Sequence, residues 1–228
     1  MSGFPWPWLS FGSLGGWKLS RAMKKTPTTL DLDFKSAPWP KPDDVLFQED
    51  ANWEHNAFLN LGGKAWGSYA HGYKGAADVL VERFLEDWQG MDTVTYPIVF
   101  LYRHYLELRL KELISDGQAL LRKPVDFQDQ HSLVQLWRPC REILREIWPH
   151  EPVATWKNVE RLLTEFDQID SDSMCFRYPV TTKKTGRQPT LPKLDRVGIR
   201  HLHEVMQRLA SFFEAHLDGV DFYRREGE

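Results

Sequence analysis

The chain has 228 residues and a formal net charge of −3, so its overall charge does not demand a nucleic-acid partner, although a local basic patch is compatible with it. Its length suffices for one large domain, or for one domain with an extension. It contains two cysteines, Cys140 and Cys175, without the spacing of a disulfide framework or a zinc site. No apolar run approaches the roughly 18 residues that a membrane span needs, and the N-terminus does not read as a signal peptide. These features predict a cytoplasmic protein with no membrane partner, no metal and no other cofactor.

The first part of the chain is rich in Trp, Pro and Gly and shows little periodicity. It includes "MSGFPWPWLSFGSLGGWK" and "SAPWPKPDD", both of which combine helix breakers with large aromatic residues. Two interpretations stay open: an irregular arm that lies on its own domain, or a segment that binds a partner protein. We predict an irregular N-terminal arm over residues 1–68 and a helical bundle over residues 69–228. The tryptophans that favour a segment lying on a surface or a partner are Trp6, Trp8, Trp17, Trp39 and Trp53.

Helical periodicity dominates the rest of the chain, with apolar residues recurring three or four positions apart. Ser132 is expected to cap the third helix, Pro97 to lie in the first turn of the second, and Pro139 to kink or break the third. No stretch alternates as a strand does, and there is no glycine-rich phosphate loop. The sequence therefore predicts an all-α, four- to five-helix bundle. The predicted helices cover residues 73–88, 99–114 with an entry through Tyr96 and Pro97, 132–148, 153–170 and about 194–217.

The stretch "VFLYRHYLELRLKELI", residues 99–114, is apolar over most of its circumference, which is typical of a central bundle helix. Four of its polar residues gather in one stripe about 100° wide on a helical wheel, whereas Arg109 and Glu112 interrupt the apolar side. Two interpretations stay open. The stripe is either a solvated edge held by i,i+4 ion pairs, or Arg103 and His104 form one wall of a polar site. The residues of the stripe are Arg103, His104, Glu107 and Lys111.

The last predicted helix carries a second polar flank. Arg196, Arg200, His203 and Gln207 fall within about 60° of one another on its wheel, and His201 lies on the other side of its core face. A row of arginines that ends in a histidine can hold a phosphate and also offer a proton donor or acceptor. The alternative is an ordinary exposed flank.

The segment "DSDSMCFRYP" precedes this helix. Asp170 and Asp172 are suited to cap or form turns. Arg177 and Tyr178 place a guanidinium and a phenol in a loop that Pro179 helps to fix, and such loops often carry site residues. The alternative is that Tyr178 packs and Arg177 pairs with an acid.

Three motifs occur in order between about Tyr73 and Leu217: "YRHYLELRLKELI", "HSLVQLW" and "FRYP". In these motifs and their spacing the chain resembles the HEPN superfamily of helical-bundle proteins, although the N-terminal arm is not covered. The resemblance implies a bundle that often dimerises. It also implies, for many members, a metal-independent ribonuclease of toxin, defence or RNA-processing systems. Other members have lost the catalytic signature and serve as binding or dimerisation modules.

The family signature is an Arg separated from a His by four to six residues on a late helix. This spacing occurs in Arg145–His150, Arg196–His201 and Arg196–His203. Only the location of each pair in the predicted helices can distinguish these three pairs, because a chain with sixteen Arg and eight His contains such spacings by chance. Pro149 interrupts the first pair, and Arg196 and His201 diverge by about 140° on a helix. Arg196 and His203 are expected to share a helix face, although Val197 stands where the family usually has a polar residue.

The resemblance implies that RNA binds in a dimer cleft, where paired Arg and His side chains activate the 2′-OH and stabilise the phosphate. Arg196 and Arg200 would contact the scissile phosphate, and His203, or alternatively His201, would move the proton. The alternative function is a non-enzymatic module that binds a nucleotide, dimerises, or holds a partner protein through its arm. In the ribonuclease hypothesis, the substrate-binding residues are Arg103, His104, Arg177, Tyr178 and Arg200.

Overall fold

A computed structural model describes residues 39–59, 65–125, 129–181, 187–191 and 194–227. It divides the chain into two units, Met1–Ala57 and Phe58–Glu228, each of which is described by itself. The described part of the first unit contains a short 3-10 helix, Trp53–His55, whose N-cap Asn52 accepts a hydrogen bond from the backbone N–H of Glu54. The predicted arm tryptophans Trp6, Trp8 and Trp17 lie outside the described residues.

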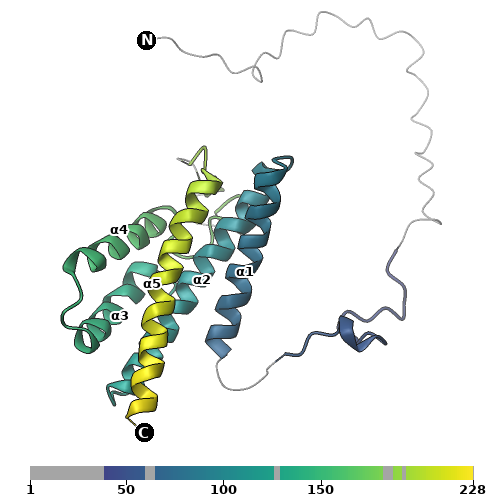
Figure 1. Cartoon of the computed structure of the whole chain (residues 1–228). Helices are drawn as coiled ribbons and strands as arrows, with labels where there is room; N and C mark the ends of the chain where they lie inside the picture. The colour runs from purple at the N-terminus through teal and green to yellow at the C-terminus, as the bar shows by residue number, and fades with distance from the viewer. Residues whose placement is uncertain (1–38, 60–64, 126–128, 182–186, 192–193, 228) are drawn as a thin grey trace, which may run out of the picture. The chain divides into compact units, whose positions relative to one another are not determined.

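The second unit is all-α, as predicted (Figure 1). Within the described ranges no strand is present, and Val180 and Pro189 form an isolated antiparallel bridge. α2 is the central helix, because α1, α3 and α5 all pack against it, while α4 packs on α3. The predicted arm boundary at residue 68 falls inside α1. The helices are α1 (Ala65–Glu86), α2 (Met91–Leu120), α3 (Leu133–Ile147), α4 (Val153–Ile169) and α5 (Ile199–Glu226).

Two prolines lie inside helices rather than at their ends. α2 begins eight residues before Val99. Pro97 therefore lies in its second turn, whereas the sequence predicted the first turn. Pro139 lies inside α3, which continues to Ile147. Both prolines are exposed, so water can hydrate the carbonyls that have lost their helical N–H partner. Packing of the apolar faces on either side then carries the helix through each proline.

The start of α5 corrects the predicted start near residue 194. Gly198 is its N-cap and has an extended backbone, with φ −78° and ψ 95°. The first helical hydrogen bond there runs from the N–H of Leu202 to the carbonyl of Gly198, at 2.8 Å. Arg196 therefore precedes the helix. α5 also ends nine residues beyond the expected Leu217. In its second half, the ring of His216 lies 5.0 Å from that of Trp148 and 5.8 Å from that of Trp156.

These aromatic side chains form a cluster where α3, α4 and α5 meet. The ring centroids of Trp137 and Trp156 are 6.2 Å apart, and each lies 6.0 Å from that of Phe212. Trp137 is fully buried and Trp156 almost so. Aromatic pairs at such separations add stability beyond the area that they bury. Part of the chain's tryptophan therefore packs in the core of the bundle.

Helices α2 and α3 pack closely against each other at a glycine. A Cβ added to Gly117 would lie 2.4 Å from Cγ2 of Ile143 on α3. We expect Gly117→Ala to lower the free energy of unfolding by about 1–3 kcal/mol, because the buried Ile143 has to move. Urea denaturation measures this loss.

Gly72 on α1 is the matched control, because a Cβ added there meets no atom within 4 Å. Gly72→Ala is expected to raise stability by about 0.5–1 kcal/mol, since alanine loses less backbone entropy in a helix than glycine does. Equal effects of the two substitutions would contradict the close helix contact at Gly117.

Candidate acid–base site

Five polar side chains from three helices meet where α1, α2 and α5 come together. The hydroxyl of Tyr102 lies 2.7 Å from Oδ1 of Asp78 and 2.8 Å from Nδ1 of His203. Lys74 donates to Oδ2 of Asp78 at 2.7 Å and to Oε1 of Gln207 at 2.8 Å. Gln207 in turn donates to Oδ1 of Asp78 at 2.9 Å. The carboxylate of Asp78, the phenol of Tyr102 and the imidazole of His203 thus form one hydrogen-bonded row, which we call the acid–base row.

Electrostatics determine where the protons lie in this row. Burial raises the pKa of Asp78, but hydrogen bonds from Lys74, Tyr102 and Gln207 outweigh it, so the pKa lies below its ordinary value. Burial, followed by the hydrogen bond to Asp78, raises the pKa of Tyr102 far above its usual range. Asp78 is therefore a carboxylate and Tyr102 a neutral phenol at neutral pH.

This proton arrangement fixes the tautomer of His203. The Tyr102 hydroxyl has one proton, which it donates to Asp78, so its contact with His203 requires Nδ1 to carry a hydrogen. In a neutral imidazole, Nε2 then holds the lone pair and is available as a base. Nε2 has a long contact of 3.5 Å with the Gln207 amide nitrogen. About a fifth of the His203 side chain is exposed, 22%, so the ring is held in place and still accessible.

The other residues proposed for the last helix divide between two places. Arg200 lies on α5 three residues before His203, which puts the two side chains on neighbouring positions of one helix surface. Arg196 lies before α5 and lines a cavity between α4 and α5 together with His201. The prediction that Arg196 and His203 share a helix face is wrong, because the helix begins only at Ile199.

Arg177 and His104 belong to a stack of aromatic side chains that is separate from the acid–base row. The guanidinium of Arg177 lies 5.5 Å from the ring centroid of Phe100, which stacks on His104 at 5.8 Å. His104 also meets the edge of Tyr73 at 4.4 Å. Burial, reinforced by the charges of nearby cations and opposed by a carboxylate, lowers the pKa of His104. Tyr178 is exposed beside Arg177. Within one chain, these residues do not meet His203.

Arg103 corrects the expectation of a solvated stripe, because it is fully buried. It donates to Glu107 at 3.1 Å, to the carbonyl of Asp170 at 2.9 Å and to the carbonyl of His131 at 2.6 Å. Glu107 also accepts from Lys111 at 2.9 Å. The i,i+4 pairs expected from the sequence are present, but inside the bundle. Arg103 therefore joins α2 to the start of α3 and the end of α4, rather than forming a wall beside His203.

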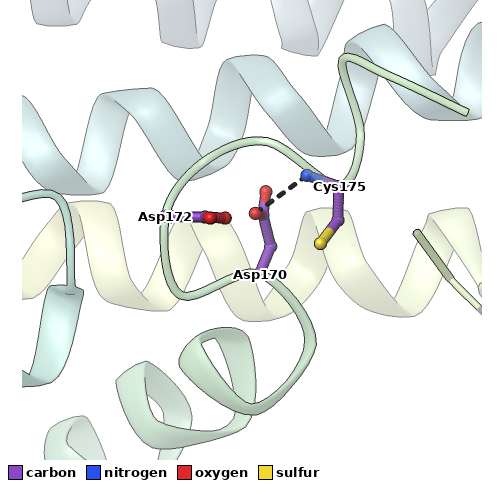
Figure 2. Close-up of side chains that lie close together, drawn as sticks. All are labelled: Asp170, Asp172 and Cys175. Atoms are coloured by element: carbon purple, nitrogen blue, oxygen red, sulfur yellow. Dashed lines mark hydrogen bonds between the residues drawn. The ribbon is translucent and has the colours of Figure 1, made fainter. Parts of the chain in front are cut away.

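Asp170 lies beside Asp172 and Cys175 in the loop after α4, with possible ligand atoms within 4.8 Å of one another (Figure 2). Its Oδ1 accepts from the backbone N–H groups of Met174, at 2.7 Å, and Cys175, at 3.0 Å. The expectation that Asp170 forms a turn is confirmed. Its Oδ2 lies 3.8 Å from Nε of Arg103, so a guanidinium already balances the carboxylate charge. A cation bound there would be repelled by this arginine, and the cluster holds the loop.

Sequence reasoning missed Asp78 and Tyr102 as members of the candidate site. Tyr102 belongs to the apolar surface of a central helix, and nothing in the sequence indicates which buried tyrosine bonds a carboxylate. A weak signal exists in the i,i+4 spacing of Lys74 and Asp78, which form an ion pair at 2.7 Å. Because such pairs are frequent on helix surfaces, this spacing does not identify a site without the contact to α2 and α5.

Comparison with protein-family models, with curated proteins and with solved structures finds no match for this chain. Among the described helices, none combines the length and apolar character needed to cross a membrane. The inference of function therefore starts from the geometry around His203 and from the sequence resemblance.

Proposed function

We propose that the chain is a metal-independent ribonuclease in which His203 moves the proton and Arg200 contacts the scissile phosphate. The observation that carries the proposal is the row from Asp78 through Tyr102 to Nδ1 of His203. It leaves Nε2 of an accessible imidazole as the base, next to a cation one turn earlier on α5. RNA as the substrate class comes from the HEPN resemblance in the sequence.

The reaction that suits these groups is attack of an RNA 2′-oxygen on the adjacent phosphorus. Nε2 of His203 removes the 2′-OH proton, while Tyr102 and Asp78 stabilise the imidazolium that forms. Arg200 balances charge on the phosphate oxygens. The bond from phosphorus to the 5′-oxygen breaks, and the imidazolium returns the proton to that oxygen. The products are a 2′,3′-cyclic phosphate and a 5′-hydroxyl.

The test uses the full chain and a single-stranded RNA in buffer with excess EDTA. We expect cleavage to persist in EDTA, and the product ends to be a 2′,3′-cyclic phosphate and a 5′-hydroxyl. An oligonucleotide with 2′-deoxy sugars is the matched control and is expected to stay intact, since it lacks the attacking oxygen. Cleavage of this control, loss of activity in EDTA, or 5′-phosphate products would each contradict the mechanism. Intact RNA under all conditions would favour the non-enzymatic alternative.

A further inference from the structure

A cavity of about 420 Å³ lies between α4, α5 and the segment that precedes α5. α4 and α5 meet at one end, where the rings of Trp156 and Phe212 are 6.0 Å apart. Toward the start of α5, the space between these helices is lined by apolar side chains such as Leu162, Phe166 and Val205. All three are only half-buried. The volume is within the range of about 300–1,000 Å³ that is usual for small-molecule sites.

Several basic side chains line this cavity. Arg161 from α4, Arg208 from α5 and Arg196 from the preceding segment contribute to its lining, together with His201. The lining includes one acid, Glu165, whose carboxylate lies 3.6 Å from Arg161. Both members of this pair are about two-thirds exposed, at 65% and 66%, so the pair is weak. The guanidinium groups of Arg161 and Arg208 outnumber the single carboxylate of the lining, which favours an anion.

The lining lacks several kinds of polar side chain, and this restricts the class of ligand that the cavity can bind. Apart from the charged residues and His201, the described residues that line the cavity are apolar or glycine, without a Ser, Thr, Asn or Gln side chain. A nucleotide would leave its base and ribose short of hydrogen-bond partners there, which costs binding free energy. A hydrocarbon body with one anionic head needs only an apolar floor and a cationic rim.

We propose that this cavity binds an aliphatic carboxylate of medium chain length. The hydrocarbon chain lies on the apolar floor formed by Leu162 and Val205, and the carboxylate accepts hydrogen bonds from Arg161 and Arg208. The site is separate from the acid–base row, because successive α5 residues diverge by about 100°. His201 and Leu202 line the cavity, whereas His203 contacts Tyr102. The proposal therefore does not depend on RNA cleavage.

Calorimetric titration of the full chain with decanoate, below its micelle-forming concentration, tests the proposal. We expect saturable binding to one site, with decanol and decyltrimethylammonium bound at least about tenfold more weakly, because neither pairs with the arginines. Adenosine monophosphate is expected to bind more weakly than decanoate. Equal binding of decanol, or tighter binding of adenosine monophosphate, would overturn the proposal.

Three variants locate the site. Arg161→Ala/Arg208→Ala is expected to weaken decanoate binding at least about tenfold, and Val205→Trp to abolish it by filling the cavity. Arg145→Ala, at an exposed position of α3 outside the cavity, is the control and should leave binding unchanged. Circular dichroism verifies that each variant is folded. Should Val205→Trp misfold, Leu162→Trp replaces it. Undiminished binding to a folded, cavity-filled variant would place decanoate elsewhere and refute the proposal.

Discussion

Replacing His203 with alanine is expected to slow RNA cleavage by about a hundredfold to ten-thousandfold, the usual contribution of a general acid–base group. The imidazole is the group that transfers the proton, and alanine leaves Tyr102 and Asp78 hydrogen-bonded to each other without a base beside the RNA. Because the His203 side chain is partly exposed, 22%, the fold should tolerate its removal. Initial cleavage rates at saturating RNA measure the loss, and circular dichroism verifies the fold.

His201→Ala provides the matched control, because His201 is exposed on the same helix two residues earlier and lines the α4–α5 cavity. It is expected to leave the cleavage rate within about twofold of the wild type, since its side chain lies on a different surface of α5. A large loss in His201→Ala with a normal His203→Ala variant would transfer the proton role to His201. Equal rates for both variants and the wild type would exclude both His201 and His203 as the base.

Replacing Arg103 with alanine is expected to lower the free energy of unfolding by about 3–5 kcal/mol, the usual cost of removing one partner from a buried ion pair. The guanidinium is fully buried and satisfies Glu107 and the carbonyls of Asp170 and His131. Alanine would leave these acceptors short of donors inside the bundle. Urea denaturation followed by tryptophan fluorescence measures the loss.

Two further arginine variants test whether the lost free energy of unfolding comes from the several N–H donors of the Arg103 guanidinium. Arg103→Lys keeps the charge but cannot reach three segments at once, so it should lose a large part of the same free energy. Arg138→Ala removes an exposed arginine from α3 and is expected to change stability by no more than about 0.5 kcal/mol. If Arg103→Ala cost less than about 1 kcal/mol, Arg103 would not be what joins α2, α3 and the end of α4.

The apolar periodicity of the sequence was enough to predict five helices and to place residues 99–114 at the centre. It also predicted the pairs Arg103–Glu107 and Glu107–Lys111, because i,i+4 neighbours are a property of one helix. Whether such a stripe meets water depends on what covers it. The backbone carbonyls that surround Arg103 come from His131 and Asp170, which are distant in sequence, so its burial was not predictable from one helix.

The candidate site was likewise predicted only in part from the sequence. Helical spacing put Arg200, His203 and Gln207 on one flank of the last helix, and the structure retains all three on α5. The same reasoning included Arg196, because no residue signals clearly that the helix begins after an extended Gly198. Helix ends depend on capping and packing as much as on propensity, so they are the part of an element that sequence determines least.

The sequence by itself determined the helices, their apolar faces and the neighbours within each helix, because these follow from local backbone geometry and the spacing of side chains. Only the tertiary structure decided that Tyr102 contacts both Asp78 and His203, which come from two other helices. It also decided that Arg103 is an internal connector instead of a surface charge. Hydrogen bonds between helices depend on their relative position and rotation, which hydrophobic burial fixes without leaving a local pattern in the chain.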